Sequence, residues 1–336
     1  MTQTSSYRAL IPPISDQANR PLWSVMIPTY NCADFLGKTL ESVLSQNVPQ
    51  DLMQIEVVDD CSTKDNPAEV VEKIGQGRVG FYRQPQNLGH VGNFNTCLQR
   101  ACGQFVHLLH GDDYVLHGFY QKMQHAFEQE PEIGAAFCRH LYMDEQGHWQ
   151  SISPLIQTEP GILSNWLERI IVQQHIQTPS VVVRRSVYEE MGGFDQRFQY
   201  YYEDWEMWVR LATQYAVWYE TEPLAAYRMR STSNSGFTIQ TGENMREVRK
   251  GLDIIQSYLP EYLPEATIEK LVKRNLEHSA VCALDTARHL LQVGNIEAGV
   301  AQIQEAFKCS LSPKVFAHLG RALLIAGVRR FIPQST

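Results

Sequence analysis

The amino-acid sequence predicts an α/β protein with a central, mostly parallel sheet, followed by a helical C-terminal region. Across residues 22–129, short apolar runs of strand length alternate with segments whose apolar residues recur at helical spacing. This alternation is typical of βαβ units and of a parallel sheet. From about Asn244 the strand patterns cease, and Leu, Ala, Glu and Gln recur at helical spacing. We therefore expect a flexible arm at 1–20, an α/β domain at 21–240 and a helical region at 241–336.

Length and composition exclude several classes of protein. The 336 residues suffice for one large domain with an appendage, and 43% hydrophobic with 20% charged residues is a globular composition. A net charge of −8 argues against nucleic acid as a partner, because phosphate contacts need Lys and Arg. Seven scattered cysteines, with no Cys-x-x-Cys pair, favour a reduced, cytoplasmic compartment. We recognise no signal peptide and no apolar run long enough to span a membrane.

The first part of the chain supplies most of the expected sheet. Pro28 ends the first strand, since proline cannot continue a ladder, and Asp34 opens the first helix, where a carboxylate complements the helix dipole. The expected elements are a strand at 22–27, a helix at 33–46, a strand at 55–60, a helix at 68–74, a strand at 79–83, a helix at 91–101, a strand at 105–109 and a helix at 117–129.

The second part of the chain is less regular. A strand and its return suggest a hairpin, and β-branched and aromatic runs suggest further strands. A glycine-bearing loop leads from one of these strands to a helix. The expected elements are strands at 134–142 and 148–152, a helix at 162–173, a strand at 179–184, a loop at 191–195, a helix at 203–212, strands at 216–219 and 224–228, and a polar loop at 231–235.

The last segment, 315–331, mixes apolar residues with Arg321, Arg329 and Arg330. A basic amphipathic helix of this kind can lie on an anionic membrane, which would place the protein peripherally at the inner face of the membrane. The alternative is a helix that docks on its own domain through its apolar face.

Acidic pairs follow two of the predicted parallel strands. Asp112 and Asp113 come after the strand at 105–109, and Asp59 and Asp60 end the strand at 55–60. Carboxyl ends of parallel strands share one edge of a sheet, where ligands bind in open α/β folds. A divalent cation with oxygen ligands would explain neighbouring like charges there, and Mg²⁺ or Mn²⁺ suits such ligands. The alternative for a single pair is a solvated acidic turn, but two pairs at one edge favour a site.

Several motifs in 23–235 occur in a characteristic order. They are the segments 24–31, 57–62, 87–89 with Asn95 and Gly103, 110–113, 192–195 and 203–205. Together they resemble the family-2 inverting glycosyltransferases, which have the glycosyltransferase-A fold. Two departures from the family pattern stand out. Gly111 replaces the first acid of the Asp-x-Asp metal motif, and the segment around Arg228 lacks the histidine that members often carry there.

The resemblance implies a nucleotide-sugar donor and residues that hold it. Tyr30 would stack on the base, and Asp60 would accept the imide N–H of a pyrimidine, which favours a UDP- or dTDP-type donor. Asp113 would be the first metal ligand, with Asp112 as a second ligand or a ribose contact. Arg228 or Arg230 would bind the diphosphate, with a structural ion pair as the alternative. The remaining donor-binding candidates are Pro28, Thr29, Asn31, Asn87 and Gly89.

The resemblance also implies a catalytic base and an acceptor loop. Asp204 is the candidate base, with its neighbour Glu203 as the alternative; the competing role for Asp204 is to complement a helix dipole. The acceptor candidates are Gly193, Phe194 and Trp205, although buried aromatic residues more often belong to the core.

These assignments predict an inverting, metal-dependent glycosyltransferase. It would move a sugar from a nucleoside-diphosphate donor to a hydroxyl group of a growing glycan, a lipid-linked saccharide or a protein. The incomplete metal motif leaves open an alternative, a nucleotide-sugar-binding protein without catalysis. A nucleotidyltransferase would need a glycine-rich phosphate loop after the first strand, and residues 28–31 do not form one.

Overall fold

The computed structural model describes residues 7–15 and 20–320. The expected arm at 1–20 and the expected helix at 315–331 therefore lie partly outside the described residues. Two compact units are distinguished. The first comprises the described residues up to Trp166 together with His175–Gln199 and Glu203–Met229, and the second comprises Leu167–Gln174, Tyr200–Tyr202 and the described residues from Arg230 onward.

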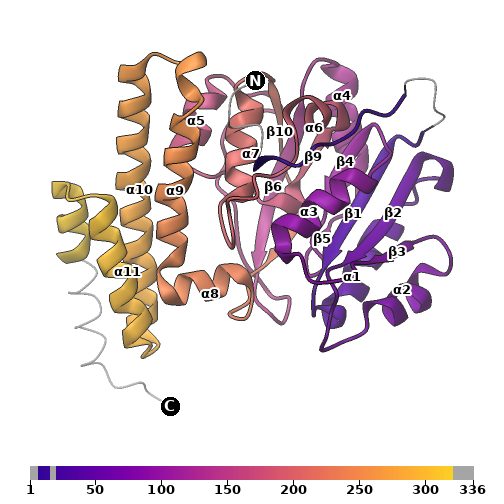
Figure 1. The fold of residues 1–336 in the computed structure, drawn as a ribbon, viewed down its shortest axis with the longest axis horizontal. Coiled ribbons are helices and arrows are strands. Elements are labelled where there is room, and N and C mark those ends of the chain that lie inside the picture. The colour runs from indigo at the N-terminus through magenta and orange to yellow at the C-terminus, as the bar shows by residue number, and fades with distance from the viewer. Residues whose placement is uncertain (1–6, 16–19, 321–336) are drawn as a thin grey trace. The chain divides into compact units, whose positions relative to one another are not determined.

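A ten-stranded sheet forms the centre of the first unit (Figure 1). Its strands follow the order β3-β2-β1-β4-β9-β6-β10-β5, and β7 pairs with β6 and β8 with β10. Strands β1 to β4 pair in parallel, β9 runs antiparallel to both its neighbours, and β10 pairs in parallel with β6. The strands are β1 (Trp23–Thr29), β2 (Met53–Asp59), β3 (Gly80–Arg83), β4 (Phe105–Leu108), β5 (Tyr114–Val115), β6 (Ala135–Met143), β7 (Trp149–Ile152), β8 (Gly161–Ile162), β9 (Val181–Arg184) and β10 (Val217–Arg228).

Helices pack on the sheet because strand side chains alternate between its two faces. Trp23, Val25 and Ile27 of β1 join a core formed with α1, α2 and α4. Helix α3 contacts β1, β2 and β4 without contributing to that core, so it packs on the other face (Figure 1). The helices of this unit are α1 (Ala33–Leu44), α2 (Pro67–Gly75), α3 (Gly89–Arg100), α4 (Phe119–Gln129), α6 (Arg185–Met191) and α7 (Glu203–Ala212), with short 3₁₀ turns η2 (Gln50–Leu52) and η3 (Thr178–Ser180).

Several elements differ from the sequence-based expectation. The two strands expected at 216–219 and 224–228 are one strand, β10, whose pairing with β6 shifts register around Pro223. Proline has no N–H to donate to the neighbouring strand, and the bulge at Pro223 accommodates this missing hydrogen bond within β10. Helix α6 was not expected, and α5 (Trp166–Val172) is shorter than the helix predicted at 162–173 because Gly161–Ile162 pairs with β10 as β8.

The second unit is helical. It contains α8 (Asn234–Thr241), α9 (Glu243–Gln256), η4 (Leu259–Glu261), α10 (Glu265–Gln292) and α11 (Ile296–Cys309). The expected polar loop at 231–235 includes the cap of α8, where the Ser233 hydroxyl accepts a hydrogen bond from the Gly236 N–H. A Cβ at Gly299 would lie 2.7 Å from Leu291, so glycine permits α10 and α11 to pack closely. Within the described residues, every helix is too short or too polar to cross a membrane.

Candidate active site

The carboxyl ends of β1, β2 and β4 lie side by side. The Asp60 N–H donates to the Thr29 carbonyl over 2.9 Å, and the Gly111 N–H donates to the Pro28 carbonyl over 3.1 Å. Parallel pairing therefore brings the segment after β1, the acids after β2 and the acids after β4 to one edge of the sheet.

A tight turn at 110–113 presents the acids that follow β4. The hydroxyl of Thr39, on α1, donates to the carbonyl oxygens of Gly111 (3.1 Å) and Asp113 (2.7 Å). A Cβ at Gly111 would lie 3.0 Å from the Cys32 sulfur and 3.1 Å from the Thr29 hydroxyl. These contacts are tight, so a side chain at this position would require Thr29 or Cys32 to shift by a few tenths of an ångström. This close packing favours glycine where the Asp-x-Asp pattern has its first acid.

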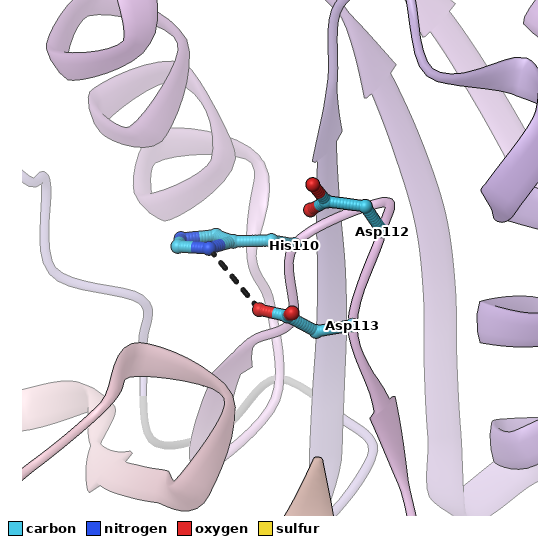
Figure 2. A group of neighbouring side chains, drawn as sticks. All are labelled: His110, Asp112 and Asp113. Atoms are coloured by element: carbon cyan, nitrogen blue, oxygen red, sulfur yellow. Dashed lines mark ion pairs between the residues drawn. The ribbon is translucent and has the colours of Figure 1, made fainter. Parts of the chain in front are cut away.

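The side chains of His110, Asp112 and Asp113 point to the same side of this turn (Figure 2). One ligand atom from each lies within 4.8 Å of the others, and His110 Nδ1 is 3.4 Å from Asp113 Oδ2. Burial raises the pKa of Asp113 to about 6, although the hydrogen bond with His110 opposes the shift. Burial alone would lower the pKa of His110, but Asp113 and the charges of Asp112 and Glu203 raise it. Such a set of oxygen and nitrogen donors can hold a divalent cation.

Arg228, at the end of β10, holds the turn in place. Its backbone N–H donates to Asp113 Oδ1 over 2.7 Å, and its Nε donates to the Asp112 carbonyl over 2.9 Å. The guanidinium also donates to the carbonyl of Glu145 and lies 4.7 Å from the centre of the Phe35 ring. These contacts favour a positioning role for Arg228 over the diphosphate contact predicted from the sequence. The other arginine of that prediction, Arg230, belongs to the second unit.

The candidate nucleotide-binding residues form two connected loops. The side chain of Asn31 accepts hydrogen bonds from the N–H groups of Thr63 and Lys64, which ties the loop after β1 to the loop after β2. Tyr30 stands out from this loop with 46% of its surface exposed. Pro28 and Thr29 are buried within β1, so they shape the loop but offer no exposed side chain.

Asp60 connects β2 to the loop before α3. Its Oδ1 accepts the Leu88 N–H over 2.7 Å, and its carbonyl accepts the Asn87 amide over 3.0 Å. Gly89, the first residue of α3, has a φ of +73°, a conformation that glycine adopts without strain. Burial raises the pKa of Asp60 to about 6, against the opposing hydrogen bonds from Leu88 and Gly89.

Glu203 and Asp204 open α7 but have different partners. Glu203 Oε2 lies 3.2 Å from Nε2 of His90. Burial alone would raise the pKa of Glu203, but the charge and hydrogen bond of His90 lower it. Asp204 accepts a hydrogen bond from the Thr178 hydroxyl over 3.3 Å, and burial together with the charge of Glu203 raises its pKa to about 7. The two neighbouring acids therefore differ: one is held ionised by a histidine, and the other titrates near neutral pH.

Sequence reasoning missed the role of His90 and Phe94. The Phe94 ring stacks on His110 at 5.1 Å between centroids and meets His90 edge-on at 5.5 Å. The Phe94 ring, on α3, therefore orients two histidines: His110 in the acidic turn and His90, which pairs with Glu203 of α7. The available signal was the four-residue spacing of His90 and Phe94, which places them on one face of a helix.

The predicted acceptor residues lie in the interior. Phe194 and Trp205 are 0% and 1% exposed, and Gly193 is buried. The Asn95 side chain binds the backbone N–H and carbonyl of Phe194, and a Cβ at Gly193 would lie 2.3 Å from the Asn95 oxygen. Both aromatic rings pack in the core, and this burial argues against the direct acceptor contact that the sequence suggested.

Comparisons with known proteins agree with this geometry. The family model for glycosyl transferase family 2 matches residues 24–192. The uncharacterized glycosyltransferase MG025 of Mycoplasma genitalium is 27% identical over 239 residues, covering 70% of this chain and 76% of the relative. The structure of Staphylococcus aureus TarS 1–349 with UDP-GlcNAc superposes with a TM-score of 0.62 at 16% identity, covering 93% of each chain. The mannosyltransferase PcManGT from Pyrobaculum calidifontis, with GDP-Man and Mn²⁺, superposes with a TM-score of 0.55 at 14% identity, covering 98% of this chain and 91% of the other.

Proposed function

Because the chain belongs to glycosyl transferase family 2, we propose that it transfers a sugar from a UDP- or dTDP-linked donor to a hydroxyl acceptor by a single, inverting displacement. Two separate features carry the proposal. The carboxyl group of Asp204 has a pKa raised to about 7, and the acidic turn at 110–113 gathers possible ligands of a cation. A transferase of this kind needs one carboxylate to accept a proton and one group of ligands to stabilise the leaving diphosphate.

Asp204 is the base in this proposal. A general base works best when its pKa lies near the operating pH, and it contributes roughly 10²–10⁴-fold in rate. The Thr178 hydroxyl and the Trp205 N–H each bind one oxygen of the Asp204 carboxylate, and these contacts fix its orientation. Glu203 is the weaker candidate, because its pairing with His90 keeps it ionised and less basic.

Asp113 and Asp112 are the proposed ligands of a divalent cation, Mg²⁺ or Mn²⁺. The site fits such an ion: Asp113 is 1% exposed, and its Oδ2 has no hydrogen-bond partner within the described residues apart from the ion-pair contact with His110. A bound cation would neutralise charge that develops on the diphosphate. Arg228 and Thr39 keep the turn that carries both acids from moving.

Tyr30 and Asp60 are the proposed contacts for the base of the donor. The exposed ring of Tyr30 offers a surface for stacking, and the Asp60 carboxylate offers an acceptor for an imide N–H. Asn87, Gly89 and Asn31 shape the loops around them. TarS binds UDP-GlcNAc and PcManGT binds GDP-Man, so the identity of the base has to be tested directly.

The acceptor in this proposal is a hydroxyl group of a growing glycan, a lipid-linked saccharide or a protein. The relative TarS is a poly(ribitol-phosphate) β-N-acetylglucosaminyltransferase, which acts on a polymer, and this supports a glycan-type acceptor here. Phe194 and Trp205 are buried, so they would support the residues of the acceptor site by packing beneath them, without contacting the acceptor.

Nucleotide binding tests the donor assignment. UDP or dTDP with Mn²⁺ should raise the melting temperature more than GDP at the same concentration, because a ligand specific to the folded state stabilises it by mass action. Asp60→Asn should reduce the shift with UDP while leaving any shift with GDP unchanged. Asparagine still accepts the Leu88 N–H, but it turns an N–H donor toward the imide. Equal or larger shifts with GDP in the wild-type protein would contradict a pyrimidine donor.

Turnover separates the transferase from a binding protein. A panel of UDP-, dTDP- and GDP-sugars is incubated with Mn²⁺, and release of the nucleoside diphosphate is measured. We expect release from at least one UDP- or dTDP-sugar. Nucleotide binding without release from any donor would instead support the catalytically inactive binding protein.

A further inference from the structure

The acidic turn contains a nitrogen donor that an oxygen-only cation site would not need. His110 directly precedes Gly111, the position where close packing against Thr29 and Cys32 favours glycine over an acid. Its Nδ1 faces Asp113 Oδ2 at 3.4 Å, and Figure 2 shows its ring on the same side of the turn as both carboxylates. His110 Nε2 is buried and has no hydrogen-bond partner among the described residues.

The spacing of these atoms fits a shared ion. Two ligands at about 2.0–2.2 Å from one cation lie roughly 2.8–3.6 Å apart when the angle between them is about 90–109°. The 3.4 Å between His110 Nδ1 and Asp113 Oδ2 falls within this interval. The three ligand atoms lie within 4.8 Å of one another, a bound that is only a few tenths of an ångström above the limit of about 4.4 Å for two ligands of one ion.

The ring of His110 is also held in place. It stacks on Phe94 with an interplanar angle of 17°. Phe94 is itself 6% exposed, so its ring packs firmly. A ligand whose orientation is fixed by its surroundings loses little freedom when an ion binds.

We propose that His110 is a ligand of the cation together with Asp113 and Asp112, and that this nitrogen makes the site prefer Mn²⁺ over Mg²⁺. The inference rests on the metal-dependent transfer proposed above and adds the residue that sets metal choice. Imidazole binds first-row transition metals well, whereas Mg²⁺ favours oxygen ligands and retains its water. In this chain, His110 compensates for the acid that is absent at Gly111.

The test uses the full chain loaded with Mn²⁺ alone and with Mn²⁺ plus UDP. Pulsed electron paramagnetic resonance detects the coupling between Mn²⁺ and a directly bound nitrogen. We expect ¹⁴N coupling in the wild-type protein, replaced by ¹⁵N coupling when the histidines are labelled with ¹⁵N. This measurement needs no mutation, so it holds even if a substitution at His110 disturbs folding.

Binding titrations provide the second readout. His110→Gln should weaken Mn²⁺ binding by about tenfold or more and change Mg²⁺ binding much less. The ratio of the Mn²⁺ affinity to the Mg²⁺ affinity should therefore fall. His148→Gln is the matched control, because His148 also pairs with an aspartate, Asp144, at 3.2 Å but lies on the surface outside the cluster. It should leave both affinities unchanged.

The outcomes separate this inference from the proposed function. Mn²⁺ that binds without nitrogen coupling, or a His110→Gln variant with an unchanged Mn²⁺ preference, would overturn the role of His110 and leave the transferase proposal standing. A protein that binds no Mn²⁺ with or without UDP would overturn both the ligand assignment and the metal dependence.

Discussion

Asp204→Asn should lower kcat by roughly 10²-fold or more while donor affinity stays near the wild-type value. Asparagine keeps the shape of the side chain; its one oxygen can accept the Trp205 N–H, and its amide NH₂ can donate to the Thr178 hydroxyl. It cannot take a proton from the acceptor. Losing the base raises the energy of the transition state and lowers kcat, but it does not weaken donor binding. Steady-state kinetics with the preferred donor measure the effect.

The same substitution makes a prediction about stability. The pKa of Asp204 is raised to about 7 in the folded protein, from an ordinary value of 3.8. A carboxyl group shifted upward stabilises the fold below its unfolded pKa, and this stabilisation is lost as the pH rises through the folded value. At pH 8 the ionised group therefore disfavours the folded state. Asp204→Asn should melt at the same temperature as the wild type or higher at pH 8, with the gain vanishing toward acidic pH.

A purely structural role predicts the opposite pattern. If Asp204 only complements the dipole of α7, Asp204→Asn should lose about 0.3–1 kcal/mol of stability and keep its activity. Glu203→Gln is the control for the neighbouring acid. It should retain more activity than Asp204→Asn and move the acid limb of the kcat/KM profile to lower pH, because the charge of Glu203 helps to raise the pKa of Asp204. An inactive Gln variant beside an active Asn variant would make Glu203 the base.

Asp113→Asn should abolish metal-dependent nucleotide binding and reduce transfer by about 10²-fold or more. The amide oxygen can still accept the Arg228 N–H, so the turn keeps its conformation. The negative charge that a hard cation requires is removed, and a cation supplies several kcal/mol of stabilisation to a developing charge. Calorimetric titration of UDP with and without Mn²⁺ measures the loss of binding.

The control for Asp113 is an acid of the same charge outside the cluster. Asp34, exposed in the first turn of α1, should tolerate Asp34→Asn with no change in nucleotide binding. Chelation offers an independent check on the unmodified protein. Turnover that persists in EDTA at the rate measured with Mn²⁺ would show that the acidic turn serves a metal-independent reaction.

Local sequence patterns were sufficient to predict the parallel part of the fold and the family. Strand and helix spacing in 22–129 reflects which side chains face a core, and this periodicity is read directly from the sequence. Likeness to TarS confirms the glycosyltransferase-A fold that the motifs implied. Because β2 and β4 both pair in parallel with β1, the acids that follow β2 and β4 had to lie at one edge of the sheet.

Contacts between distant segments were not predictable in the same way. The pairing of His90 with Glu203 joins residues from α3 and α7, and the bonds from Arg228 to the acidic turn join β10 to the segment after β4. No local pattern encodes either contact. The burial of Phe194 also depends on a distant partner, because the Asn95 amide binds its backbone. The sequence motif indicated where this loop lies in the chain, but it did not indicate that the Phe194 ring points into the core.

The glycine at position 111 departs from the Asp-x-Asp motif, and the structure offers a steric reason for this departure. From the sequence alone it is a missing metal ligand. In the structure it is a position of close packing, where an added Cβ would lie 3.0 Å from the Cys32 sulfur and 3.1 Å from the Thr29 hydroxyl, which favours glycine. The neighbouring His110 and Asp113 then carry the chemistry of the turn.

The stereochemistry of the released sugar tests the central claim most directly. The donor with the highest turnover, if α-linked, is incubated at high enzyme concentration with water as the acceptor, and the product is followed by ¹H NMR before its anomers equilibrate. A single displacement assisted by the Asp204 carboxylate predicts that the β-anomer appears first. Initial appearance of the α-anomer would contradict direct displacement and, with it, the role assigned to Asp204.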